Sequence, residues 1–197
     1  MDFARLTEAL AFKSYEKIAD ICDDLMLQAA AEGVDYQDEW PYVIHFLGYL
    51  YVDDINSARF FWKSIPSTIK ENRPELVAVW KIAQKLWIQD HRGVYEAIHG
   101  FDWCQEVQGL LVAFSDLYRR RMFQLLVSAY STISIRDAAH FLGMNEEEAK
   151  NYVTRRGWIV DVASEMLTVK KQEIGREQKL DSSKLQRLTE YVFHLEH

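Results

Sequence analysis

The 197-residue chain has few cysteines and no surplus of positive charge. Its two cysteines, Cys22 and Cys104, are far apart and lack a metal-ligand spacing, which suits a reduced cytosolic or nuclear compartment better than a secreted one. We expect both to be buried thiols. The net charge of −7 argues against a partner bound mainly through its phosphates, so a protein partner fits better than a nucleic acid.

Long hydrophobic runs and catalytic motifs are also missing. The longest apolar run, Val43–Val52, contains His45 and is too short to cross a bilayer. The N-terminal residues lack the pattern of an export signal, so we expect neither export nor insertion into a membrane. The chain has no Walker A loop, Gly-x-Ser-x-Gly elbow or His-Glu-x-x-His motif. His194 and His197 lie three apart but lack a third clustered ligand. We expect no metal, no cofactor and no enzymatic activity, although a nucleophilic cysteine stays open, because triad partners need not be close in sequence.

What the sequence does contain is helical periodicity over its first two thirds. Apolar residues recur at spacings of three and four between Ser14 and Gly33, which predicts a helix with one buried stripe and a glycine stop. Trp40–Tyr51 is apolar nearly all round, which predicts a helix packed between neighbours, with Pro41 in its first turn. The sequence therefore predicts several helices that share one core.

Further helices follow with recognisable start and stop residues. Asp53 or Asp54 is expected to cap a helix that Pro66 interrupts, and Pro74 opens the next one. The segments around Asp54 and Asp90 resemble each other at a separation of 36 residues, which is typical of helical-hairpin repeats. On their inner stripes these helices carry three tryptophans that we assign to packing: Trp62, Trp80 and Trp87. A long helix over about 102–130 is expected to join this array to the region that begins near Ser134.

The pattern changes between Ser134 and Val169. A short helix from Ile135 is stopped by Gly143, and a second helix begins at Asn145, whose type favours an N-cap. After Gly157, two segments rich in β-branched and aromatic residues, separated by 161–165, predict a hairpin. Two short helices followed by a hairpin make a winged helix.

The remaining residues divide into a spacer and a final helix. Residues 170–180 are polar and lack a sustained period, whereas 181–197 carry leucines and a valine at spacings of three and four, as in a bundle helix. We therefore predict a mostly α-helical fold with a tetratricopeptide- or HEAT-like array over 1–131 and a winged-helix subdomain over 132–169. The spacer and a C-terminal bundle helix complete it, with Leu185, Leu188, Val192 and Leu195 on the partner-binding seam.

The winged helix raises a choice between a nucleic acid and a protein as its partner. Residues 134–169 hold four basic against six acidic side chains, and Glu146–Glu148 open the helix that would read base edges. A hairpin with an open edge can instead be extended by a partner's strand. We prefer this second interpretation, whose candidate residues are Trp158, Ile159, Val160, Met166, Leu167 and Val169. The three arginines Arg119, Arg120 and Arg121 cannot share one helix face, so we expect one or two of them to pair with acids of a neighbouring helix.

Four segments carry a resemblance to a known family: Asn56–Pro66, Tyr118–Phe123, Asp137–Gly143 and Leu185–Val192. Together with the order of helical array and winged helix, they resemble the PCI family, shared by the proteasome lid, the COP-nine signalosome and translation initiation factor three. The segments are most similar to the signalosome branch. In that family the subunits associate through their winged-helix sheets, and their C-terminal helices gather in one bundle.

The resemblance implies a non-catalytic scaffold. The signalosome removes the ubiquitin-like modifier Nedd from cullin-type ubiquitin ligases through a metalloprotease on another subunit. The expected partners are therefore other PCI subunits of the signalosome and its C-terminal helical bundle, with cullin-type ligases as indirect partners and a cytoplasmic and nuclear location. Two alternatives remain open: a PCI scaffold subunit of the proteasome lid, and a winged-helix nucleic-acid-binding protein.

Overall fold

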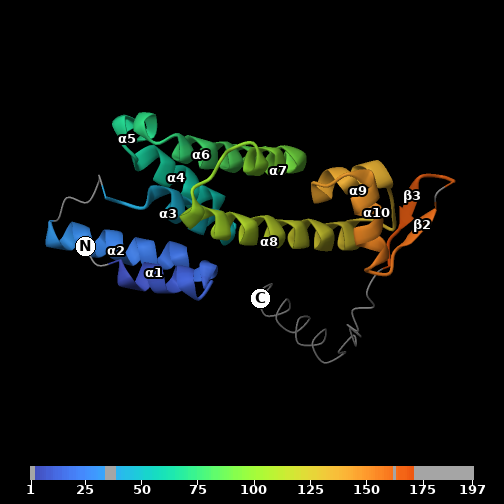
Figure 1. The fold of residues 1–197 in the computed structure, drawn as a ribbon, viewed down its shortest axis with the longest axis horizontal. Helices are drawn as coiled ribbons and strands as arrows, with labels where there is room; N and C mark the ends of the chain where they lie inside the picture. Colours follow the sequence, from blue (N-terminus) through green and yellow to red (C-terminus); the bar gives the residue numbers. More distant parts are fainter. Residues whose placement is uncertain (1–2, 34–38, 162, 171–197) are drawn as a thin grey trace, which may run out of the picture.

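The protein is described here by a computed structural model that covers residues 3–33, 39–161 and 163–170. It is mostly helical, with a small three-stranded antiparallel sheet near the end of the described residues (Figure 1). In chain order, the elements are α1 (Ala4–Ala11), the 3-10 helix η1 (Tyr15–Lys17), α2 (Ile18–Glu32), α3 (Tyr42–Tyr51), α4 (Ile55–Ser64), α5 (Ser67–Asn72), α6 (Pro74–Trp87), α7 (His91–His99), α8 (Gln105–Ala129), β1 (Thr132–Ser134), α9 (Ile135–Leu142), α10 (Glu146–Thr154), β2 (Ile159–Asp161) and β3 (Met166–Thr168).

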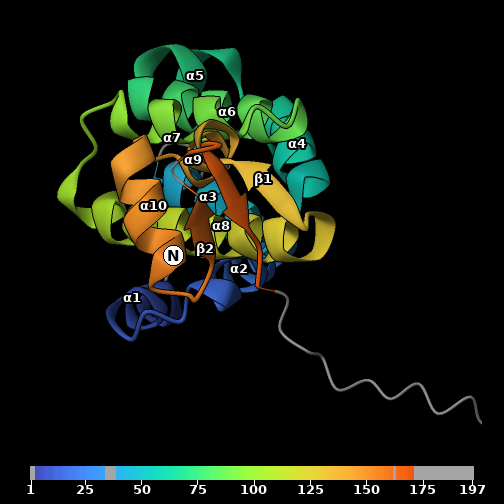
Figure 2. The ribbon, with the colours of Figure 1, turned by 90° about the vertical axis from the view of Figure 1, so that its right-hand side faces the viewer.

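The long helix α8 runs from the helical part to the sheet (Figure 1). Viewed from the sheet end, α9, α10 and the three strands stand in front of the helices α1 to α7 (Figure 2). Two separate hydrophobic clusters hold the chain together, one built from residues between Leu6 and Tyr118 and one from residues between Leu126 and Val169. Since α8 contributes to both clusters, it connects them.

The predicted helix boundaries are largely confirmed, with some differences. The segment before Gly33 forms η1 and α2, and Gly33 ends α2 with a left-handed φ of 67°. Pro41 is the N-cap of α3 and does not lie in its first turn, whereas Pro74 opens α6 as predicted. The helices α1 and α5 were not predicted from the sequence. The predicted spacer, except for Lys170, and the predicted C-terminal helix lie outside the described residues.

One tight turn recurs three times between consecutive helices. In each copy a non-glycine residue has a φ of 55° to 67°, and the next residue's N–H donates to a carbonyl five positions earlier at 2.9–3.0 Å. Asp54 and Asp90 follow two of these turns, and their carboxylates accept the N–H of Ser57 and Gly93 at 2.9 Å. The similarity between these two segments therefore extends to backbone geometry; the three positive-φ residues are Lys13, Asp53 and Gln89.

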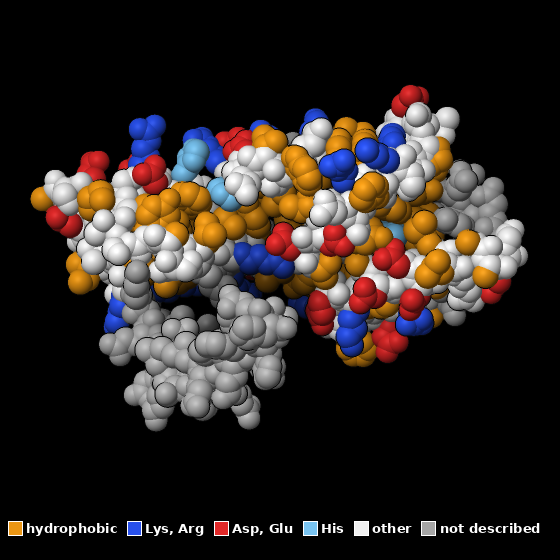
Figure 3. Space-filling model, turned by 180° about the vertical axis from the view of Figure 1, so that it is seen from behind, with side chains coloured by type: hydrophobic (Ala, Val, Ile, Leu, Met, Phe, Trp, Pro, Cys, Tyr) orange, Lys and Arg blue, Asp and Glu red, His pale blue; other side chains and the backbone are white. Residues whose placement is uncertain are grey.

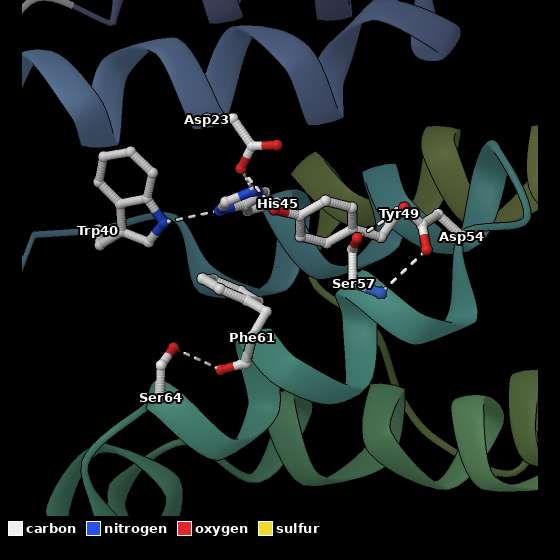
Figure 4. Close-up of polar contacts among 8 residues, drawn as sticks. All are labelled: Asp23, Trp40, His45, Tyr49, Asp54, Ser57, Phe61 and Ser64. Atoms are coloured by element: carbon white, nitrogen blue, oxygen red, sulfur yellow. Dashed lines mark hydrogen bonds and ion pairs between the residues drawn. The ribbon is translucent and has the colours of Figure 1, made fainter.

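A buried histidine organises the core around α3 (Figure 4). The Trp40 Nε1–H donates to His45 Nδ1 at 3.2 Å, and His45 Nε2 lies 3.1 Å from Asp23 Oδ1, which also accepts the Tyr49 hydroxyl. An accepting Nδ1 means that the ring is neutral with its proton on Nε2. Burial lowers the pKa of His45, which outweighs the opposing effect of Asp23. The centroid of the His45 ring lies 4.2 Å from that of the Phe61 ring. Through Asp23 of α2 and Phe61 of α4, His45 therefore links α3 to both neighbouring helices.

Two expectations about burial need correction. Cys22 is buried, and burial raises its thiol pKa to about 12, but Cys104 is exposed because it precedes α8 at the surface. Trp62 and Trp80 pack against the larger cluster, whereas Trp87 is 53% exposed. Trp87 is the last residue of α6, where the helix leaves the core, so helical spacing alone does not predict its exposure.

The sheet has the strand order β1-β3-β2, so β3 is central and β2 lies at an edge. Both neighbours pair antiparallel with β3: Leu167 lies opposite Ile133 of β1 and opposite Val160 of β2. The predicted hairpin is β2 and β3. The strand β1 was not predicted, because its three residues stand between two helices; its only sequence signal is the β-branched pair Thr132 and Ile133.

Candidate partner-binding surface

Local capping holds the two short helices beside the sheet as the sequence indicates. The Ser134 hydroxyl accepts the Asp137 N–H at 3.0 Å and starts α9, and Gly143 ends it with a φ of 63°. Asn145 and Glu148 form a capping box at the start of α10, with bonds of 2.7 and 3.2 Å. These bonds satisfy helix-end donors that would otherwise need water, so both helices begin at defined positions.

Three of the six predicted sheet residues point into the protein. Trp158 and Val169 are buried and Leu167 is fully buried, all within the smaller hydrophobic cluster. Trp158 stacks on Phe123 of α8, with ring centroids 5.2 Å apart. These side chains hold the sheet against α8, and a partner cannot contact them in this conformation.

The other three lie nearer the surface and are unequally exposed. Ile159 is the most accessible, at 68%, while Val160 and Met166 are half-buried. Ile159 and Val160 belong to the edge strand β2, whereas Met166 belongs to the central strand. Among the described residues, no strand pairs with the outer side of β2, so an exposed apolar side chain and an open strand edge lie together there, which is the arrangement that strand addition requires.

The hairpin between β2 and β3 is held at both ends. The Asp161 carboxylate accepts the Ala163 N–H at 3.0 Å and the Ser164 hydroxyl at 2.7 Å, and these bonds lower its pKa. Glu165 has a φ of 53°, and its carbonyl accepts the Ile135 N–H at 3.0 Å. The turn is thus fastened to α9, and the direction of β2 is fixed.

The other predicted surface cannot be located in the structure. Leu185, Leu188, Val192 and Leu195 lie outside the described residues, so the bundle helix stays a prediction.

The three consecutive arginines of α8 serve different contacts. Arg121 lies 3.6 Å from Asp53 and donates to the Tyr51 carbonyl at 2.9 Å, which ties α8 to the turn before α4. Arg119 donates to the Leu142 carbonyl at 3.3 Å and so reaches the end of α9, while Arg120 is exposed. Arg121 therefore pairs with an acid of the turn between α3 and α4, and Arg119 pairs with Asp116 of its own helix, so the expected pairing with acids of a neighbouring helix is not found among the described residues. The three arginines do not form one basic patch.

Within residues 3–33, 39–161 and 163–170, no cluster of three or more His, Cys, Asp or Glu side chains has the arrangement of a metal site, and no helix has the length and apolarity needed to cross a membrane. The first turn of α10 carries three exposed glutamates, Glu146–Glu148, which would repel phosphates at the end of a helix that a winged helix uses for base contacts.

Comparison with known proteins supports a specific assignment. The model of the CSN8/PSMD8/EIF3K family matches residues 36–178. A protein of Arabidopsis thaliana named COP9 signalosome complex subunit 8 is 66% identical over 197 residues, which cover all of both chains. The protein of the same name from Xenopus laevis is 34% identical over 184 residues, or 93% of each chain, and that of Dictyostelium discoideum is 24% identical over 197 residues, or 100% of this chain and 98% of its own. The chain therefore belongs to the CSN8/PSMD8/EIF3K family.

Proposed function

We propose that this chain is a non-catalytic subunit of a COP9 signalosome, the complex that removes a Nedd-type modifier from the cullin subunits of ubiquitin ligases. The observation that carries this proposal is the 66% identity, over the whole of both chains, to a protein named as subunit 8 of that complex. Identity at this level over both whole chains supports membership of the same kind of complex. The exposed Ile159 on the edge strand β2 suits association with another protein.

In this proposal the described residues form a PCI module. The helices α1 to α7 are a helical-repeat array, which the recurring turn at Lys13, Asp53 and Gln89 supports. The elements β1, α9, α10, β2 and β3 are a winged helix, as their order and the central position of β3 suggest. The predicted division at residue 131 would then separate array from wing, with α8 shared between their cores.

The mechanism we propose is assembly through the β2 edge. A neighbouring subunit's strand would pair with the free side of β2, and Ile159 would be covered in the contact. Main-chain hydrogen bonds supply affinity in such strand addition, while alternate side chains supply specificity. The C-terminal helix around Leu185 and Leu195 would add a second contact in a shared bundle.

The proposed function is tested by purifying the tagged chain from its own cells and identifying the polypeptides that remain bound. Signalosome subunits in a complex of defined native mass are expected. Recovery of proteasome-lid subunits, or of the chain alone, would contradict the proposal.

The proposed edge is tested by placing a charge on it. We expect Ile159→Asp to weaken association with the neighbouring subunit about tenfold or more, because a charged side chain at an exposed edge opposes strand addition. Thr132→Asp is the matched control: Thr132 and Ile159 both lie opposite Thr168, one on each edge of the sheet. Pull-down from a co-expressed mixture measures both. Equal retention of the two variants would rule out the β2 edge. A Leu167→Pro variant would not test the edge, because Leu167 is fully buried and belongs to the central strand.

A further inference from the structure

A second surface lies between α4 and α6. An open groove of about 570 Å³ is lined there mainly by Ile55, Arg59, Trp80, Ala83, Trp87 and Ile88. Trp87 and Ile88 are 53% and 63% exposed, and neighbouring Phe60 is 65% exposed. Large apolar side chains gathered at one exposed place mark a contact surface more often than isolated ones do.

The floor of the groove is rigid and aromatic. Trp80 stacks on Trp62 with ring centroids 5.0 Å apart and planes only 3° from parallel. Lys70 lies 4.8 Å from the Trp62 ring and covers the far side of this pair. Both indoles also pack against the main hydrophobic cluster, so the floor does not need to be ordered when something binds.

Basic side chains surround this apolar floor. The Arg59 guanidinium lies 5.2 Å from the Trp87 ring and 5.9 Å from the Phe60 ring, and Lys63 lies 6.0 Å from Phe60. Among the residues that the structure describes, Arg59, Lys63 and Lys81 form no ion pair with a carboxylate. Figure 3 shows this face, with basic side chains among hydrophobic ones over α4 and α6 at the upper right.

The local charge is opposite to that of the rest of the chain. Residues 55–88 contain six Lys or Arg and two Glu, a net charge of +4, so the other residues carry −11 of the total of −7. Charges of one sign gathered on one face steer a partner of the opposite sign. The groove therefore combines an apolar anchor point with Arg59, which has no carboxylate partner among the described residues, and with Lys85, which pairs with Asp90 at 2.7 Å.

We propose that this groove binds an acidic segment of a partner protein that carries an apolar side chain between its acidic residues. The apolar side chain would lie against Trp80, Trp87 and Ile88, and its flanking carboxylates would pair with Arg59, Lys63 and Lys81. Guanidinium–carboxylate pairs are strong charge-assisted contacts, and tryptophan and arginine are the residues most enriched among interface hot spots. This surface is separate from the β2 edge, so it does not depend on the proposed assembly contact.

The test uses the full chain and a short fluorescent peptide with a Leu-Phe pair flanked on both sides by Asp and Glu. Fluorescence anisotropy measures its affinity, and the indole N–H signals in an NMR spectrum show which tryptophan it contacts. We expect binding that perturbs the Trp87 signal and weakens about tenfold in Arg59→Glu and in Trp87→Ala. Two control variants change an exposed residue elsewhere and should bind as the unmodified chain does: Lys17→Glu on η1 and Leu27→Ala on α2.

Three results would overturn the proposal. The first is no binding, or binding that Arg59→Glu leaves unchanged. The second is equal affinity for a peptide in which serines replace the Leu-Phe pair, which would show simple ion exchange. The third is a single-stranded oligothymidylate that displaces the peptide and binds the same site more tightly, which would make the groove a nucleic-acid site.

Discussion

Gly143→Ala is expected to destabilise the chain by about 3 kcal/mol, the sum of a left-handed backbone cost and an overpacking cost. Gly143 has a φ of 63°, and a Cβ built on it would lie 2.0 Å from the Tyr95 ring. Tyr95 cannot move aside easily, because it is buried and its ring packs against the Tyr118 ring and the Arg119 guanidinium. The close approach joins α9 to α7, so the substitution should loosen the contact between the helical array and the sheet end.

Thermal unfolding measures this effect, and Gly33→Ala is its matched control. Gly33 also has a left-handed φ of 67°, but none of the described residues has an atom within 4 Å of its Cβ position. The control should lose only the backbone component, about 1 kcal/mol, or about 2–4 °C in Tm, against about 6–12 °C for Gly143→Ala. Tyr95→Ala should remove most of the extra loss when it is combined with Gly143→Ala. Equal Tm values for the two glycine variants would contradict the packing described at Gly143.

His45→Leu is expected to cost about 3 kcal/mol at pH 7.5. Leucine has a similar volume but cannot accept the Trp40 Nε1–H in the core or donate to the half-buried Asp23, and a buried donor that loses its partner costs about 1–3 kcal/mol. Chemical denaturation measures the loss. His140→Leu is the control, because His140 is exposed and should change stability by no more than about 0.5 kcal/mol.

The same variant tests the protonation state of His45. Burial lowers its pKa in the folded chain, so below about pH 6.5 the unfolded chain binds more protons and the folded state loses stability as the pH falls. Leucine binds no proton in either state. The difference in unfolding free energy between the chain and His45→Leu should therefore shrink from pH 7.5 to pH 5.5, whereas a difference that grows would mean that the folded ring is charged.

Asp23 affects the stability of the folded chain at lower pH than His45 does. Burial would raise its pKa, but the hydrogen bonds from His45 and Tyr49 outweigh burial and lower it below the ordinary 3.8. Its contribution to stability is therefore present above about pH 4 and is lost only as the pH falls further. The contributions of His45 and Asp23 to stability can therefore be distinguished by the pH range in which each is lost.

Helix ends were the most predictable part of the fold, because capping depends on neighbouring residues. Asp54, Asp90 and Asn145 accept the N–H groups expected of N-caps, and Gly33 and Gly143 end their helices with positive φ. Each of these roles needs one residue type at one local position. The turn at Lys13 was missed, because lysine gives no signal for a positive φ.

Features that depend on distant contacts were less predictable. The hairpin was expected from its β-branched residues, but whether β3 is central depends on β1, which lies 30 residues or so before it in sequence. Alternation within β2 places Ile159 and Val160 on opposite faces, but which of the two is exposed follows only when the buried face of the sheet is known. Likewise, the helical stripe containing Trp87 does not reveal where α6 leaves the core.

In the proposed assembly, a neighbouring subunit's strand covers the β2 edge. This claim can be tested by comparing hydrogen exchange of the Ile159–Asp161 amides between the free chain and the assembled particle. The Leu167 amide in the central strand serves as the internal reference, since β3 is already paired on both sides. We predict slower exchange in β2 on assembly while the reference stays unchanged; equal exchange of β2 in both states would contradict the claim.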